Sequence, residues 1–118
     1  MFRIENKHIY INRGDKATIN LVNNTDIFRI GEFILFTICK NGDYTNVISQ
    51  KRVDIDVNSD TVVIELTSED TTIGEPLKNT STDYWYEISL NGDTTLVGYD
   101  KNGPKIITLW PEAPAEEV

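Results

Sequence analysis

Apolar and polar residues alternate with a period of two along most of the chain, and turn residues interrupt the alternation roughly every ten positions. This pattern is typical of short β-strands that bury one face. The alternating stretches are rich in isoleucine, valine, threonine, tyrosine and phenylalanine, which suit a pleated, half-buried surface. The pattern predicts strands over residues 2–5, 8–12, 16–22, 33–40, 44–50, 53–57, 61–66, 83–90, 94–99 and 105–110.

A helical period is missing from the sequence, apart from one short turn expected at residues 68–74, where Ser68 would cap the helix and Gly74 would end it. Many short strands with frequent turns predict a single all-β domain over residues 1–110, an immunoglobulin-like antiparallel β-sandwich. A small closed barrel is the alternative. Residues 111–118 carry two prolines and three glutamates without periodicity, and we expect a flexible acidic tail there.

The core is predicted from one phase of the alternation, which five of the strands share. Side chains in this phase are aliphatic or aromatic, and we expect them to be buried between two sheets. The predicted core residues are Ile19, Leu21, Ile34, Phe36, Ile38, Val62, Ile64, Leu66, Tyr86 and Ile88.

The hairpin predicted over residues 33–50 is apolar on both faces. A two-residue turn at Asn41 and Gly42 would place Leu35 opposite Ile48, with Phe33 nearby, on the face away from the core. A sheet with one face in water should not be apolar on both sides. We therefore expect a cover, which is either the long polar segment 67–82, with Leu77 filling the gap, or another chain.

Trp85 should also face outward, because its neighbours in the strand occupy the core phase. A two-residue turn at Asn91 and Gly92 would lay Trp85 across Gly98, where the ring would cover exposed backbone. A three-residue loop would shift the register and remove this contact. The candidate interface therefore consists of Phe33, Leu35, Ile48 and Trp85.

One acidic stretch matches part of a calcium-binding loop. The match to positions 1, 3, 5, 7 and 12 of an EF-hand involves Asp54, Asp56, Asn58, Asp60 and Glu65. However, Ser59 stands where the loop needs glycine, and the flanking segments alternate as strands rather than helices. We expect a hairpin with acidic exposed positions here, and no metal or other cofactor.

The other chemically suggestive residues have simpler interpretations. The Arg-Gly-Asp sequence at 13–15 fits a turn between two strands. His8 is the only histidine and should face outward, and Cys39 is the only cysteine, so no internal disulfide can form. Neighbouring carboxylates such as Glu69 and Asp70 are typical of solvated loops. These features favour a protein that is not an enzyme.

Composition and charge argue against several classes of partner and several classes of protein. The net charge of −8 would repel nucleic-acid backbones and anionic membranes. The hydrophobic content of 39% is too high for a disordered chain. No apolar run approaches the roughly 20 residues of a membrane span. The first residues contain no apolar signal core, so we expect no secretion, and a single cysteine suits a reducing compartment.

Several segments in order resemble a known family of phage proteins. They are INRGDKATINL at 11–21, FILFTICK at 33–40, VVIELTSEDT at 62–71, YWYEISL at 84–90, GDTTLVG at 92–98 and ITLWPE at 107–112. The chain resembles small prophage tail proteins related to the N-terminal domain of the siphophage baseplate upper protein. The resemblance implies an immunoglobulin-like fold and a non-catalytic structural role in the tail or baseplate.

The resemblance also implies where the protein would act and with what. It would reside in the virion, and in the host bacterial cytoplasm during assembly, in contact with other virion subunits or with further copies of itself.

A different function is that of a carbohydrate- or surface-binding module. Such a module would use Trp85, Tyr84, Tyr99 or Trp110 as stacking platforms, which would line one concave groove. A small hydrolase is a further alternative, and it would need convergent carboxylates in a pocket.

Overall fold

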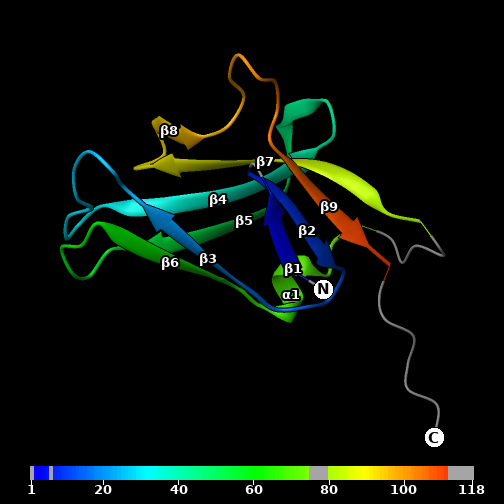
Figure 1. Ribbon diagram of the computed structural model, residues 1–118, viewed down its shortest axis with the longest axis horizontal. Helices are drawn as coiled ribbons and strands as arrows, with labels where there is room; N and C mark the ends of the chain where they lie inside the picture. The colour runs from blue at the N-terminus through cyan, green and yellow to red at the C-terminus, as the bar shows by residue number, and fades with distance from the viewer. Residues whose placement is uncertain (1, 6, 75–79, 112–118) are drawn as a thin grey trace, which may run out of the picture.

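The structure is a computed structural model that describes residues 2–5, 7–74 and 80–111 (Figure 1). The described residues form nine strands and one short helix, close to the elements that the sequence predicts. These are β1 (Phe2–Glu5), β2 (His8–Asn12), β3 (Ala17–Val22), β4 (Phe33–Lys40), β5 (Asp43–Asp54), β6 (Thr61–Leu66), α1 (Ser68–Thr71), β7 (Thr82–Leu90), β8 (Thr94–Val97) and β9 (Ile106–Trp110). The tail expected at 111–118 lies outside the described residues beyond its first position.

The strands form two sheets of unequal width. The larger sheet has the order β1-β2-β9-β7-β4-β5, and β8 pairs with the second half of β7. The smaller sheet contains β3 and β6 and lies over one part of the larger sheet (Figure 1). All pairs are antiparallel except β2 with β9, which are parallel. The prediction of a single all-β domain is therefore confirmed, with one parallel pair in place of a fully antiparallel arrangement.

The core lies between the two sheets and is built from the predicted alternation. Nine of the ten predicted core residues are buried, and Leu21 is only partly buried at the edge of the core. Phe36 and Tyr86 stack with their ring centroids 5.5 Å apart. The core also contains buried residues that were not among the predicted ten, chiefly Ile9, Ile11, Phe28, Ile55, Ile107 and Leu109.

β5 is one strand of 12 residues, whereas the sequence predicted two shorter strands. The turn at Asn41 and Gly42 has two residues as expected, but two irregularities beside Cys39 then shift the register. A bulge inserts residues into one strand and changes every pair beyond it. Leu35 therefore lies opposite Arg52, and the predicted pairing of Leu35 with Ile48 is wrong.

The register between β7 and β8 also differs from the prediction. Leu90 pairs with Thr94, so the loop contains three residues rather than two. A Cβ added to Gly98 would lie 2.8 Å from Thr95 and 3.3 Å from Glu87, so these side chains cover Gly98. The predicted contact of Trp85 with Gly98 is wrong because the third loop residue and a further irregularity between Ile88 and Ser89 both shift the register.

α1 is shorter than the predicted turn and begins one residue earlier than expected. Thr67, not Ser68, is the N-cap, and Thr67 and Asp70 form a capping box. The Asp70 carboxylate also accepts a hydrogen bond from Lys51 Nζ at 2.9 Å, which ties the helix to β5.

Across the described residues, no helix has the length and apolar character needed to span a membrane.

We predict that Phe36→Ala lowers the free energy of unfolding by about 3–5 kcal/mol, because it removes a buried ring from the centre of the core. Phe33→Ala is the matched control, since Phe33 is partly exposed on the outer face, and its loss should be clearly smaller. Urea denaturation of the three proteins measures both values. A loss below about 1 kcal/mol for Phe36→Ala would contradict the position of this ring in the core.

We also predict that the contribution of Asp70 to stability depends on pH. Burial raises the pKa of the Asp70 carboxyl, but hydrogen bonds from Thr67 and Lys51 outweigh burial and hold the pKa below its usual range. A lowered pKa in the folded state stabilises the protein above the unfolded pKa of about 3.9, and this stabilisation is lost as the pH falls through the folded value. Asp70→Asn should therefore cost roughly 1 kcal/mol at pH 7.

The cost of Asp70→Asn should shrink below about pH 4, where the carboxyl begins to protonate in the unfolded state before it does so in the folded state. Denaturation curves of wild type and variant, recorded between pH 7 and pH 2.5, measure the difference. A difference that stays constant across this range would show that the carboxylate charge contributes nothing to the cap.

Candidate protein interaction surfaces

The structure does not bring the four candidate interface residues together in one patch. Phe33 and Leu35 lie on the outer face of β4, because they alternate with buried Ile34 and Phe36. Trp85 pairs with Cys39, whereas Leu35 pairs with Ser89, so Trp85 and Leu35 are four residues apart along the sheet, or about 14 Å. Ile48 lies at the β5 irregularity and is exposed.

Phe33 and Leu35 are covered in part by residues that sequence reasoning missed. The Arg52 guanidinium lies 3.9 Å from the centroid of the Phe33 ring. The β7–β8 loop lies over the same site, because Asn91 N donates to Phe33 O at 2.8 Å and Gly92 approaches both side chains. The cover was not predictable, since it depends on the shifted registers of both hairpins.

The segment 67–82 follows a different path from the one expected of a cover, as far as it is described. Asp70 binds Lys51, and Lys51 pairs with buried Phe36, which places α1 toward the inner side of the larger sheet. Leu77 lies outside the described residues. The described part of this segment therefore does not cover Phe33 and Leu35.

β5 forms a long edge of the larger sheet. Among the described residues it pairs with β4 on one side and with no strand on the other. Two adjoining depressions of about 240 and 360 Å³ lie along this edge and share Val53, Asp54 and Val63. Farther along the same strand, the side chains of Val47 and Ile48 are 51% and 38% exposed. An unpaired edge of this length is a template for pairing with another strand.

Trp85 packs in a small aromatic cluster on the outer face. Its ring centroid lies 4.8 Å from that of Tyr44 and 6.0 Å from that of Tyr99. Tyr99 is 63% exposed, so the cluster reaches solvent. The structure thus explains the outward tryptophan by packing with two tyrosines, and Tyr44 enters the cluster because β5 is irregular beside Cys39.

The other two aromatic residues proposed as stacking platforms lie elsewhere. Tyr84 belongs to the opposite face of β7 from Trp85, and its hydroxyl approaches Gly74. Trp110 is the last residue of β9, beside Asn12. The single groove expected of a carbohydrate-binding module is therefore not formed by these four residues.

His8, Thr108 and Asp83 form a hydrogen-bonded chain across β2, β9 and β7. Thr108 Oγ1 donates to Asp83 Oδ1 at 2.7 Å and lies 2.7 Å from His8 Nε2. The single hydroxyl proton points to the carboxylate, so His8 must donate to Thr108. This direction is opposite to that of a hydroxyl nucleophile activated by a histidine base. These hydrogen bonds therefore connect β2, β9 and β7.

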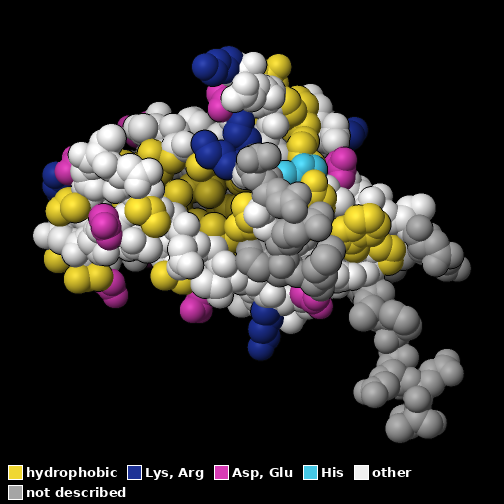
Figure 2. All heavy atoms as spheres, viewed as in Figure 1, with side chains coloured by type: hydrophobic (Ala, Val, Ile, Leu, Met, Phe, Trp, Pro, Cys, Tyr) yellow, Lys and Arg dark blue, Asp and Glu magenta, His cyan; other side chains and the backbone are white. Residues whose placement is uncertain are grey.

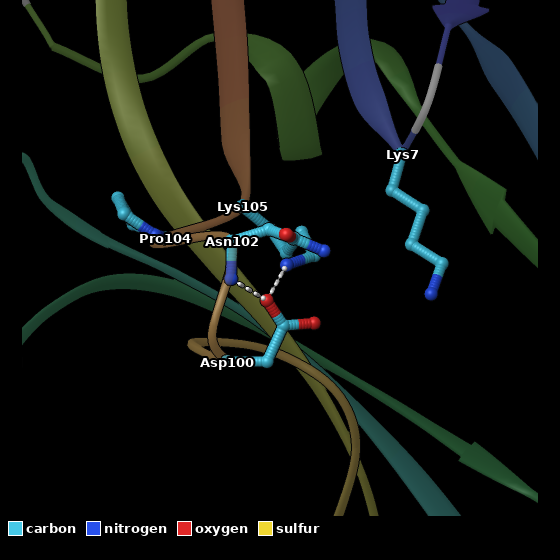
Figure 3. A pocket seen from close by; sticks show the side chains of 5 residues that line it. All are labelled: Lys7, Asp100, Asn102, Pro104 and Lys105. Carbon is cyan, nitrogen blue, oxygen red and sulfur yellow. Dashed lines mark hydrogen bonds and ion pairs between the residues drawn. The ribbon is translucent and has the colours of Figure 1, made fainter.

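The connection between β1 and β2 borders a polar hollow of about 440 Å³ (Figure 3). Asp100 Oδ1 accepts hydrogen bonds from Lys105 Nζ at 3.0 Å and from Asn102 N at 2.8 Å. The hydrogen bond from Lys105 is the main reason that the pKa of Asp100 is lowered. Figure 3 shows the Lys7 side chain standing apart from this ion pair.

The residues of the predicted EF-hand match have partners of other kinds. Asp54 accepts from Arg52 Nε at 2.9 Å, and Asn58 Oδ1 accepts from Ile30 N at 2.9 Å. Glu65 is exposed near the end of β6. In the described part of the chain, no three histidine, cysteine, aspartate or glutamate side chains gather as a metal site would require.

Two further candidates have structural partners. Arg13, the first residue of the Arg-Gly-Asp sequence, donates from Nε to Ile73 O at 3.0 Å and so ties the β2–β3 turn to the segment after α1. Cys39 is buried, and burial, followed by the charges of Glu87 and Asp43, raises the pKa of its thiol. A raised pKa keeps the thiol protonated and lowers its reactivity.

We predict that calcium does not bind at residues 54–65, because these side chains are distributed over two strands and their connection. Thermal melting curves recorded with millimolar calcium and with a chelator should coincide. A specific site at a hundredfold excess over its dissociation constant would add about 2.7 kcal/mol of stability, which melting would detect. An increase of this size would contradict the assignment.

The chain was compared with known protein families, curated proteins and solved structures. Neither a protein family, nor a curated protein, nor a solved structure was found that matches the chain.

Proposed function

We propose that this protein is a non-enzymatic structural component of a phage or prophage virion, in the tail or baseplate, and that it acts through protein–protein contacts. The observation that carries the contact function is the 12-residue strand β5, whose outer edge pairs with no strand in the part of the chain that the structure describes. The proposal includes an immunoglobulin-like topology for the two-sheet fold. The phage assignment is supported by the resemblance of the segments at 11–21, 33–40 and 84–90 to tail proteins.

The β5 edge can join another chain by strand addition. Every second residue of an edge strand presents its backbone N–H and C=O groups outward, where a strand of a partner can bind them. The depressions beside Val53, Asp54 and Val63 can then receive alternate side chains of the added strand. Backbone hydrogen bonds would supply attraction, and the depressions would supply selectivity.

The expected strength of one such contact is modest. Covering the half-exposed side chains of Val47 and Ile48 contributes roughly 1 kcal/mol each. Association costs at least about 4 kcal/mol in lost translational and rotational freedom. One edge therefore binds weakly in solution, and several edges engaged together bind far more tightly. This behaviour suits a subunit of a symmetric assembly, whose partners are other virion subunits or further copies of the chain.

A carbohydrate- or surface-binding module is the second candidate, and the aromatic cluster is the observation that favours it. Trp85 and Tyr99 lie together, and Tyr99 presents most of its ring to solvent. Titration with neutral hexoses and oligosaccharides, followed by tryptophan fluorescence, tests this function. A saturable change that disappears in Tyr99→Ala, with Tyr10→Ala as the control, would favour the module over the structural role.

We predict that Ile48→Lys weakens self-association or binding to virion subunits, because it places a charge on the β5 edge at an exposed apolar position. Ile30→Lys is the matched control, since Ile30 is 65% exposed in the β3–β4 connection. Both variants should unfold within about 0.5 kcal/mol of wild type. Light scattering over a range of concentrations measures the masses, and only Ile48→Lys should remain small.

Leu35→Lys separates this edge from the outer face of β4. Because Arg52 and the β7–β8 loop already lie over this region, we expect Leu35→Lys to lower stability rather than to change the mass. A wild-type chain that stays monomeric at high concentration and binds no neighbouring gene product would overturn the proposed contact function. Flanking tail genes would support the phage assignment, and a metabolic operon would contradict it.

A further inference from the structure

A second hollow lies between the smaller sheet and β8. It measures about 460 Å³, and its apolar lining consists of Leu21, Val22, Phe28, Leu96 and Val97. Figure 2 shows a hollow with an apolar floor on this face, with basic side chains beside it. The hollow exists because a sheet of two strands cannot cover the inner face of a sheet of seven. Val97 pairs with buried Ile88, which places it on that inner face.

The free edge of β3 borders this hollow. β3 pairs with β6 on one side and with no other strand among the described residues. Its last two residues, Leu21 and Val22, line the hollow together with β8, whereas no residue of β6 lines it. The hollow therefore lies on the side of β3 that faces away from β6. An extended segment bound to this edge can point every second side chain into the hollow.

Lys7 supplies a positive charge at the mouth of the hollow. It lines both this hollow and the polar one beside Asp100, and its side chain is exposed. Lys105 binds Asp100 and Gly103 O directly, whereas Lys7 forms no ion pair within 4 Å among the described residues, although its charge contributes to the lowered pKa of Asp100. In a chain of net charge −8, this cation creates a local site for an anionic group.

The backbone holds Lys7 in an unusual conformation. Its φ of 67° lies in the left-handed region, which glycine and asparagine adopt more easily than lysine does. The buried Tyr86 hydroxyl donates to Lys7 O and fixes the position of the turn. Asparagine would adopt this conformation at lower cost, so the turn itself does not require a lysine.

We propose that this hollow binds an extended peptide segment of a partner protein, which pairs with the free edge of β3, places an apolar side chain in the hollow and sets a carboxylate against Lys7. The apolar lining selects the first side chain, and the charge of Lys7 selects the second. The edge of β3 favours a peptide over a small amphipathic acid, because it offers backbone hydrogen bonds that only a peptide satisfies. This site is separate from the β5 edge, and either can fail without the other.

The test uses two matched peptides and the full chain. Both peptides alternate threonine and valine, and they differ only in a central glutamate or lysine. Two-dimensional amide NMR follows each titration. We expect shifts at residues 21–25 and 96–97, and about fivefold tighter binding of the glutamate peptide, the upper range for one exposed ion pair. The preference should fall as salt is added.

Lys7→Asn separates the role of the side chain from that of the turn. Asparagine tolerates the left-handed conformation, so this variant should be at least as stable as wild type and should bind both peptides within a factor of two of each other. Lys16→Asn is the control, because Lys16 is exposed in the β2–β3 connection and makes the same change in net charge. It should keep the preference for glutamate.

Three results would overturn the proposal. The first is equal binding of the two peptides by wild type, which removes the role of Lys7. The second is a set of shifts that maps away from β3 and β8, or no shift at all, which removes the hollow as the site. The third is saturable binding of octanoate in the hollow without binding of either peptide, which would assign the site to small amphipathic acids.

Discussion

Tyr86 connects the hydrophobic core to two lysines, Lys7 and Lys105. Its ring stacks on Phe36, and its hydroxyl donates to Lys7 O. Burial raises the pKa of this hydroxyl to about 12, so it stays protonated and remains a donor at neutral pH. Its backbone N–H also binds Lys105 O at 3.0 Å. One buried residue therefore fixes both lysines that line the hollow in Figure 3.

The unequal width of the two sheets explains where the proposed interaction surfaces lie. A sandwich of equal sheets would close its core on all sides, whereas here two strands cover a sheet of seven. The uncovered region opens on one side as the hollow between β3 and β8. The opposite side leaves the edges of β5 and β6 next to each other, with the depressions between them. Among the described residues, both surfaces combine an unpaired strand edge with a concave region, which is largely apolar beside β3 and mixed in character beside β5.

Much of the fold follows from local sequence patterns. Alternation identified the buried phase correctly at Phe36, Ile64 and Tyr86, because burial of one sheet face imposes a period of two. The alternation does not predict how many residues a bulge or a loop contains. The irregularity at Cys39 and the third loop residue at Asp93 each moved a register, and with it every cross-strand pair that we derived from the registers.

The geometry of the candidate interaction surfaces was harder to predict than the core, because it depends on the same registers. The cover of Phe33 by Arg52 and the contact of Trp85 with Tyr44 both depend on those registers. The parallel pairing of β2 with β9 joins residues about a hundred positions apart, and no local pattern encodes it. Lys7 carried no signal at all, because a lysine between two short strands is an ordinary exposed residue until its backbone conformation is known.

Charge sets the conditions under which either surface can work. Copies of a chain with net charge −8 repel one another, but salt at physiological strength screens that repulsion beyond about 8 Å. Contact between copies is then decided at short range, by backbone hydrogen bonds and apolar area along β5. On that edge Arg52 pairs with Asp54, and Lys51 pairs with Asp70. Their charges are thus balanced locally, whereas the proposed peptide site beside β3 includes the exposed Lys7, so the two proposed surfaces would select different partners.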